Sequence, residues 1–179
     1  MGVYRSNLIT YPVRYAAADP EETGFVPLGM EEKLSLRQIL AKHPKGQDFG
    51  WIVEEFEKFP FLTDARSEVL SFPPIINSAE IGAVQVGDSE LFIEMTGTEL
   101  PSLVHAASIV ACDLADAGHT ILPVTIEYPF DTCFGRNITL PWYFQNPVST
   151  DTVEVAGLLG EELDTEEIIA CLSRMGVRG

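Results

Sequence analysis

The sequence has few basic residues, and this shortage excludes several classes of partner. Of its 179 residues, 11 are Lys or Arg and 27 are Asp or Glu, so the formal net charge is −16. A surface of this sign opposes general binding to phosphate backbones and to anionic membranes. We therefore expect no DNA partner and no membrane partner, and any contact with another nucleic acid must be local.

Cysteines and long apolar stretches are also scarce. Cys112, Cys133 and Cys171 are far apart, form no CxxC pair and have no histidine at the spacing of zinc ligands. This pattern predicts buried, reduced thiols and no metal site. No stretch approaches the roughly 18 apolar residues of a membrane span, and none resembles a signal peptide. These absences predict a cytoplasmic protein.

The common catalytic signatures are missing. The sequence contains no GxSxG, no HExxH, no P-loop and no dinucleotide-binding glycine triplet. His43, His105 and His119 are isolated, so each is interpreted as a surface or hydrogen-bonded histidine rather than as a general base. Without further information, the sequence predicts a soluble α+β domain of unspecified chemistry.

The composition is otherwise that of a folded domain with one core. Hydrophobic residues make up 46% of the chain and charged residues 21%, close to ordinary globular usage. Ser35 predicts the N-terminal cap of a helix that ends at Pro44. After Asp48, apolar residues at helical spacing predict a second helix, which Pro60 ends.

Residues 61–72 predict a β-hairpin, because two apolar runs flank the polar segment 64–67. The expected register places Leu62 opposite Val69. Since side chains alternate along a strand, Leu62 and Ser71 then point to the same face.

The segment 91–96 predicts a strand with two unlike faces. Its odd positions are all apolar and predict a core face. Its even positions carry Phe92, Glu94 and Thr96, which place a carboxylate and a hydroxyl beside an aromatic ring. This second face is either solvated or lines a pocket.

Further helices are expected toward the end of the chain. Thr98 predicts the N-terminal cap of a long helix that Gly118 ends, and a strand is expected over residues 121–128. Two short helices are predicted at residues 152–159 and 164–175, the second with a capping box at its start.

Four blocks of sequence carry a resemblance to a known family. They are Phe25-Val26-Pro27-Leu28-Gly29, His43-Pro44-Lys45-Gly46, Ser71-Phe72-Pro73-Pro74-Ile75-Ile76-Asn77-Ser78 and Phe92-Ile93-Glu94-Met95-Thr96-Gly97-Thr98. In this order and spacing they closely resemble the β subunit of phenylalanyl-tRNA synthetase of the archaeal and eukaryotic type. The resemblance covers about residues 2–135 as the editing module of that subunit. Residues 150–177 resemble the opening helices of the small domain that follows.

The resemblance has consequences for fold and domain organisation. It implies an α+β fold of layered, mixed, sandwich-like β-sheets with packed helices, followed by a short helical fragment of the next domain. Residues 1–135 would form the editing, tRNA-binding module. Residues 136–149 would be a linker, and residues 150–179 the truncated start of the following small helical domain.

The resemblance also implies a function. In this family the editing module hydrolyses tyrosine that has been attached to tRNA(Phe) by mistake, while a separate site in the α subunit makes the aminoacyl bond. The chain is thus expected to be a deacylase module of an ATP-dependent ligase, with no cofactor of its own, since ATP and Mg belong to the absent synthetic site. Expected partners are the acceptor end of tRNA(Phe) and the α subunit. The alternative is a structural or subunit-contact module without independent deacylase activity.

By resemblance, the pocket residues are Leu62, Ser71, Glu94 and Thr96. Glu94 would accept a hydrogen bond from the tyrosyl phenol or bind the ammonium group, although members of the family can carry Asp at this place. Leu62 would pack against the ring, and Ser71 with Thr96 would position water or the terminal ribose. These assignments make Glu94, Thr96 and Ser71 the catalytic candidates.

Three further residues complete the expected site. Thr98 is a substrate-binding candidate, because the free N–H groups of a helix that begins there can stabilise the oxyanion of ester hydrolysis. Lys42 and Lys45 are the candidate tRNA contacts, within a group of four basic residues between positions 33 and 45. A solvated helix face is the alternative interpretation of that group.

Overall fold

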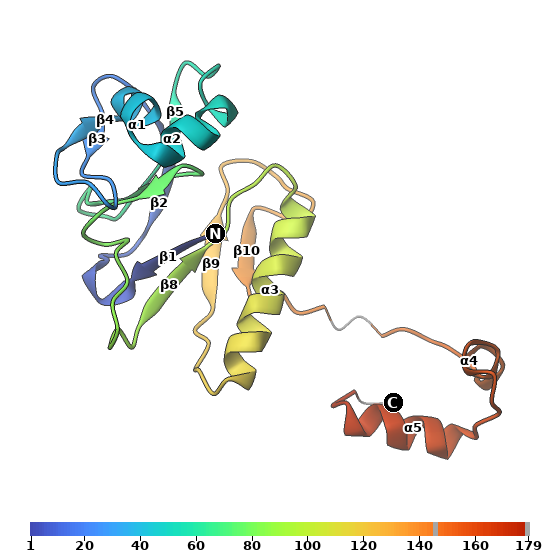
Figure 1. Ribbon diagram of the computed structural model, residues 1–179. Coiled ribbons are helices and arrows are strands. Elements are labelled where there is room, and N and C mark those ends of the chain that lie inside the picture. Colours follow the sequence, from blue (N-terminus) through green and yellow to red (C-terminus); the bar gives the residue numbers. More distant parts are fainter. Residues whose placement is uncertain (145–146, 178–179) are drawn as a thin grey trace. The chain divides into compact units, whose positions relative to one another are not determined.

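The computed structural model describes residues 1–144 and 147–177. The chain divides into two compact units, Met1–Trp142 and Tyr143–Gly179 (Figure 1). Strands and helices are mixed, so the expected α+β class is confirmed. Residues 145–146 of the expected linker and residues 178–179 of the expected helical segment lie outside the described residues. The assignment of residues 1–135 to an editing module stays a prediction.

The first unit contains most of the secondary structure. In chain order its strands are β1 (Gly2–Arg5), β2 (Arg14–Ala18), β3 (Gly24–Phe25), β4 (Leu34–Ser35), β5 (Phe59–Thr63), β6 (Val69–Phe72), β7 (Ile76–Asn77), β8 (Leu91–Glu94), β9 (Val124–Glu127) and β10 (Asn137–Leu140). Its helices are α1 (Leu36–Lys42), α2 (Pro44–Phe49) and α3 (Leu100–Asp116), with short 3-10 turns at Ser6–Leu8 and Gly50–Ile52. The second unit contains α4 (Thr152–Leu159) and α5 (Thr165–Arg174).

The centre of the first unit is an antiparallel sheet of four strands in the order β2-β5-β6-β7. Apolar side chains cover both of its faces. The helix-side cluster packs α1 and the β3–β4 pair against one face and comprises Phe25, Leu34, Leu36, Ile39, Val53, Phe59, Phe61, Phe72 and Ile75. The inter-sheet cluster joins the other face to the antiparallel β1–β8 pair and comprises Tyr4, Ile9, Leu62, Leu70 and Ile81. The sheet is therefore the middle layer of three.

The β5–β6 hairpin forms where it was expected, but in a different register. Leu62 pairs with Ser71, and Thr63 pairs with Val69, so Leu70 has no partner across the ladder. This bulge corrects the expected pairing of Leu62 with Val69. Because an extra residue re-aims the side chains that follow it, Leu62 and Ser71 still share a face, as predicted, and now stand directly opposite each other.

The helix expected from Ser35 is confirmed. The Ser35 side chain accepts the backbone N–H of Gln38, and the Gln38 side chain accepts that of Ser35. The next helix differs from its prediction, because α2 starts at Pro44 and not after Asp48. A proline fits the first turn of a helix, where its missing N–H costs nothing, and the His43 ring caps this turn by accepting the Lys45 N–H.

The expected helix after Asp48 does not form. The chain leaves α2 at Phe49 and continues through a 3-10 turn, so the apolar stripe is broken. Val53 and Phe59 are buried, whereas Trp51 and Phe56 are 68% and 57% exposed. Helical spacing alone could not distinguish these two arrangements, since both place Val53 and Phe59 in the core.

Helix α3 packs against the β9–β10 hairpin (Figure 1). Its Val104 and the facing Ile138 are buried, and the Ser108 hydroxyl accepts the backbone N–H of Trp142 at 3.0 Å. Strand β10 lies in the first part of the segment 136–149, which is expected to be a linker. Residues 137–140 show no alternation strong enough to predict this strand beside Pro141 and the aromatic residues that follow.

The second unit consists of the two short helices expected at its positions. Asp164 and Glu167 form the predicted capping box of α5. No residue of α4 or α5 is buried. Among the described residues, no helix is long and apolar enough to cross a membrane. Cys112, Cys133 and Cys171 are exposed, which corrects the expectation of buried thiols.

Asp64 fixes the turn between β5 and β6. Its buried carboxylate accepts the backbone N–H groups of Thr10, Arg66 and Glu68 at 2.9, 2.8 and 2.9 Å. Burial raises the pKa of Asp64, but these three donors outweigh it and hold the pKa below its ordinary value of 3.8. The contacts tie this turn to the segment that precedes β2.

We predict that Asp64→Asn lowers the free energy of unfolding by about 1–3 kcal/mol at pH 7, because charge-assisted hydrogen bonds are lost. A lowered folded-state pKa means that this stabilisation is complete above pH 4 or so and disappears as the pH falls through the folded pKa. Urea unfolding at pH 7 and pH 3 measures the difference. Asp113→Asn, on the exposed side of α3, is the control, and an equal loss at both pH values would contradict the assignment.

Candidate functional site

Two residues of the expected site, Ser71 and Glu94, are hydrogen-bonded to Tyr4, a residue that the sequence did not predict there. The Tyr4 hydroxyl lies 2.8 Å from Ser71 Oγ and 2.8 Å from Glu94 Oε2. A phenol has one hydrogen and a carboxylate can only accept, so Tyr4 donates to Glu94 while the Ser71 hydroxyl donates to the Tyr4 oxygen. Burial and the charge of Glu94 raise the pKa of Tyr4, which keeps this donor protonated. We call these three residues the Tyr4 group.

Two pairs of strands bring the Tyr4 group together. Strands β1 and β8 pair so that Gly2 stands opposite Glu94 and Tyr4 opposite Phe92. This face is turned toward β5 and β6, where Leu62 and Ser71 are paired. Tyr4 is fully buried between the two layers. The structure thus places Leu62, Ser71 and Glu94 around Tyr4, and their role as a site stays a prediction.

The two faces of β8 are not buried as expected. Leu91 is exposed, and Ile93 and Met95 are only half-buried. Phe92 and Glu94 are half-buried as well, and Phe92 packs against the inter-sheet cluster. Apolar alternation identified two faces correctly, but neither is the fully buried core face that it predicted.

Glu94 is half-buried at the edge of this group, and a second tyrosine lies near it. Tyr15 on β2 pairs with Leu62 and therefore shares its face of the sheet. Its side chain is 58% exposed. Partial burial and then the charge of Glu94 raise the pKa of Tyr15, so Glu94 acts on this ring as well. The charge of Glu94 therefore raises the pKa of two phenols, the buried one of Tyr4 and the exposed one of Tyr15.

Ser71 and the two threonines occupy different positions from those expected. Ser71 is only 2% exposed and its hydroxyl is bonded to Tyr4, so it does not face a position open to solvent. Thr96 is half-buried beyond the end of β8, and Thr98 is exposed. Among the described residues, no hydrogen bond joins Thr96 or Thr98 to Glu94.

Thr98 does not cap α3, which corrects the sequence prediction. The helix begins at Leu100, and Glu99 is its N-cap with no side-chain hydrogen bond. Pro101 stands in the first turn and contributes no N–H. An acidic cap and a missing donor make this end a poor site for an oxyanion, because negative charges repel one another there.

Tyr4 is the functional candidate that sequence reasoning missed. Strand β1 is four residues long, too short to display alternation, and its partner Glu94 is 90 positions away. The one local signal is Gly2. A Cβ there would collide with the Tyr4 hydroxyl and lie 2.6 Å from Glu94 Oε2. A glycine two residues before a strand tyrosine therefore marks a close approach of another chain segment.

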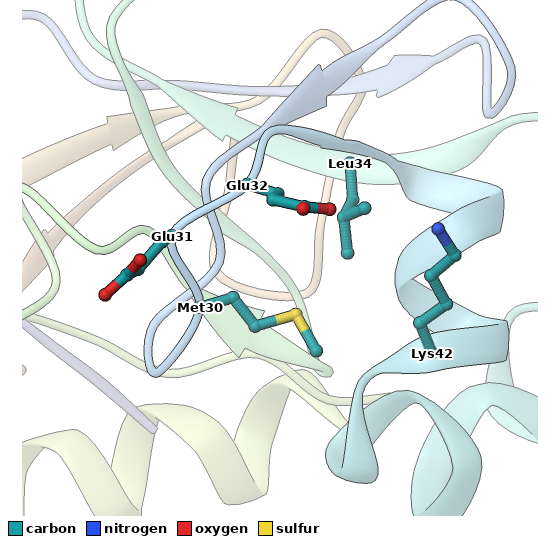
Figure 2. Close-up of a pocket in the computed structure, with 5 residues that line it drawn as sticks. All are labelled: Met30, Glu31, Glu32, Leu34 and Lys42. Atoms are coloured by element: carbon teal, nitrogen blue, oxygen red, sulfur yellow. The ribbon is translucent and has the colours of Figure 1, made fainter.

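The basic residues expected to form a tRNA contact are interleaved with acidic ones. A surface pocket of about 360 Å³ is lined by Glu32 and Lys42 among others. In Figure 2 these two side chains lie on either side of Leu34. Arg37 pairs with Glu21 at 3.4 Å. Lys45 lies over the Phe49 ring at 5.3 Å. This surface has mixed charge, and Glu94 does not line its pocket.

Within the residues that the structure describes, no group of three or more His, Cys, Asp or Glu side chains is placed to hold a metal ion. His43 is buried and fully hydrogen-bonded, since its Nδ1 accepts the Lys45 N–H and its Nε2 donates to the Leu28 carbonyl. This confirms the interpretation of His43 as a hydrogen-bonded histidine.

Comparison with known proteins finds clear relatives of the chain. No family model matches it. It is 44% identical to the phenylalanine–tRNA ligase β subunit of Borrelia duttonii, over 99% of the chain and 31% of that protein, and 47% identical to that of Borrelia garinii over the same shares. Over nearly its whole length, the chain is thus similar to a part of phenylalanine–tRNA ligase β subunits. It spans about a third of the length of these relatives.

A solved structure shows the same similarity. An N-terminal fragment of the Pyrococcus horikoshii phenylalanyl-tRNA synthetase β subunit matches with a TM-score of 0.87 and 32% identity. The match covers 97% of this chain and 48% of the Pyrococcus chain. The fold of this β-subunit homologue is therefore that of the N-terminal fragment.

We predict that Gly2→Ala destabilises this β-subunit homologue by about 1–3 kcal/mol, because the added methyl group displaces the Tyr4 hydroxyl or the Glu94 carboxylate. Thermal unfolding followed by near-UV circular dichroism measures the change. Gly157→Ala is the matched control, since nothing lies within 4 Å of the Cβ it adds in α4. A Gly2→Ala protein as stable as the parent would show that the close approach at Glu94 is absent in solution.

Proposed function

We propose that this β-subunit homologue is an editing module that hydrolyses tyrosyl-tRNA(Phe) in preference to phenylalanyl-tRNA(Phe). One observation carries the proposal: the half-buried Glu94 carboxylate, beside Leu62 and Tyr15, already accepts a hydrogen bond from a phenol at 2.8 Å. The same chemistry suits the hydroxyl of a tyrosyl group. The relatives of the chain supply the context, a ligase that handles phenylalanine and its tRNA.

Editing meets a physical need of a phenylalanine ligase. A pocket shaped for phenylalanine rejects an added hydroxyl poorly, whereas a site that bonds the hydroxyl can reject its absence by a factor of about 10⁴ or more. A carboxylate that reads the hydroxyl therefore belongs in a second, hydrolytic site. Glu94 has the required acceptor, and Leu62, which is 3% exposed in the inter-sheet cluster, is proposed to support the site from the core and not to face solvent.

The proposed reaction is hydrolysis of the aminoacyl ester by water. Water attacks the carbonyl carbon, the bond from that carbon to the ribose oxygen breaks, and the released tRNA hydroxyl takes a proton. No activated nucleophilic side chain lies at Glu94, so a water positioned near the substrate, aided by the other hydroxyl of the terminal ribose, is the attacking group. The proposal requires no metal or cofactor in this chain, and ATP and Mg belong to aminoacylation elsewhere in the ligase.

The proposed partners are the acceptor end of tRNA(Phe) and the ligase α subunit. With a net charge of −16, the chain cannot supply the main affinity for tRNA. Lys42 and Lys45 are proposed to guide the acceptor end, while other parts of the ligase hold the rest of the tRNA. Thr96, beside Glu94 in sequence, remains our proposed neighbour of the terminal ribose, and the buried Ser71 is proposed to act through Tyr4.

A second function is favoured by a different observation. Trp51 and Phe56 are exposed on one short segment, which suits a contact surface within a larger assembly. The alternative is a structural module that binds the rest of the ligase and does not deacylate. Hydrolysis by the chain alone separates the two functions.

Glu94 variants test the proposed function. If Glu94 reads the phenol, Glu94→Ala removes a charge-assisted hydrogen bond and lowers selectivity for tyrosyl-tRNA(Phe) about ten- to 150-fold. Hydrolysis of phenylalanyl-tRNA(Phe) should stay near the parent rate. The measurement is kcat/KM for both substrates, with Glu90→Ala, an exposed carboxylate just before the same strand, as the control.

A different outcome has a definite meaning. If Glu94→Ala slows both substrates equally, Glu94 binds the ammonium group that both share and does not read the phenol. If neither substrate is affected, the site lies elsewhere. Melting curves of both variants accompany the kinetics, because Glu94→Ala leaves the buried Tyr4 hydroxyl with Ser71 as its remaining partner, and a loss of stability must be separated from a loss of selectivity.

We also predict weak, salt-dependent binding of tRNA by the isolated chain. Replacing Lys42 and Lys45 together by Ala should reduce the residual affinity and make its dependence on salt less steep, because fewer counterions are released. Electrophoretic mobility shifts or fluorescence anisotropy at several salt concentrations measure both effects. Sub-micromolar binding at physiological salt that survives the double substitution would refute the assignment.

A further inference from the structure

The Tyr4 group leaves the two oxygens of Glu94 in different situations. Oε2 accepts a hydrogen bond from the Tyr4 hydroxyl. Gly2 lies so close to the same oxygen that a Cβ at this position would be only 2.6 Å from it. Tyr4 is held in turn by the Ser71 hydroxyl on the neighbouring sheet. One carboxylate oxygen is therefore fixed from the protein interior, while the side chain as a whole stays half-exposed.

We propose that Tyr4 is a positioning residue for specificity: its hydroxyl holds Glu94 Oε2 so that Oε1 is presented to the hydroxyl of a tyrosyl substrate. This inference rests on the proposed function. It also gives Ser71 a role that suits its burial, since Ser71 orients Tyr4 and does not contact the substrate. Glu94 thus binds the substrate hydroxyl through Oε1, while Oε2 is held by Tyr4.

Displacement of Tyr4 by the substrate is the competing arrangement, and burial argues against it. The Tyr4 ring is fully buried in the inter-sheet cluster with Leu62, Leu70 and Ile81. It also packs against Phe92, with ring centroids 6.0 Å apart. Moving this ring out would open a cavity between the two sheets, which is costly in a packed core. A fixed donor is the arrangement that the packing supports.

Fixing a carboxylate in this way has a kinetic consequence. A free Glu side chain samples several rotamers, and binding of the substrate must then fix the productive one at a cost in side-chain entropy. A hydrogen bond from a rigid donor removes that freedom before binding. Loss of the Tyr4 hydroxyl should therefore weaken recognition of the tyrosyl hydroxyl and leave the common ester chemistry unchanged.

The test is Tyr4→Phe, alone and combined with Glu94→Ala. Tyr11→Phe is the matched control, because Tyr11 packs on the same Phe92 ring but bonds Ser6 instead of Glu94. We expect Tyr4→Phe to lower kcat/KM for tyrosyl-tRNA(Phe) about tenfold, with phenylalanyl-tRNA(Phe) unchanged. In the Glu94→Ala background the same substitution should have no further effect, since residues that act through one another are not additive.

The outcomes separate this inference from the proposed function. Unchanged selectivity in Tyr4→Phe, an equal loss for both substrates, or additive effects with Glu94→Ala would overturn the positioning role while the editing function stands. A parent chain with no deacylase activity overturns both. If the melting curve shows that Tyr4→Phe does not fold, Ser71→Ala replaces it with the same expected pattern, because it removes the group that orients Tyr4.

Discussion

The hydrogen bond between the Tyr4 hydroxyl and the Glu94 carboxylate connects the layers on which the candidate site is built. It joins the first strand of the chain to a strand about 90 residues later, and Ser71 extends the contact to the central sheet. A buried phenol without a partner would be costly, and so would a half-buried carboxylate without a donor. Each group satisfies the other, so the packing of the two layers and the orientation of Glu94 depend on the same contact.

The central sheet provides the rigidity that such a site requires. It has an apolar cluster on each face, and the helix-side cluster includes stacked rings of Phe59 and Phe72 with centroids 5.5 Å apart. Side chains that stand on a strand buried on both faces have little freedom to move. Leu62 and Ser71 therefore offer a fixed wall, against which β1 and β8 place Tyr4 and Glu94.

Local signals in the sequence were read correctly where neighbouring residues decide the structure. The capping boxes of α1 and α5 join residues three positions apart, and the β5–β6 hairpin is closed by its own turn. Leu62, Ser71 and Glu94 were grouped by alternation and by family resemblance, and the structure places them together. Their chemical roles stay predictions.

The features that the sequence did not predict depend on contacts between residues far apart in the chain or on local backbone details. The pairing of β1 with β8 brings Tyr4 to Glu94, and no pattern within residues 91–96 carries that information. The bulge at Leu70 and the start of α2 at Pro44 each depend on the backbone conformation of one or two residues. A hairpin without the bulge, or a helix that starts later, would fit the same pattern of apolar residues. Tyr4 was missed for the same reason, since its partner lies far away in the chain.

The most direct measurement of the central claim is the rate at which the unmodified chain hydrolyses tyrosyl-tRNA(Phe) and phenylalanyl-tRNA(Phe) under identical conditions. If Glu94 accepts a hydrogen bond from the tyrosyl hydroxyl, kcat/KM should favour the tyrosyl substrate by at least about ten- to 150-fold, the contribution of one charge-assisted hydrogen bond. Equal rates for the two substrates, or no hydrolysis above the uncatalysed reaction, would contradict the account.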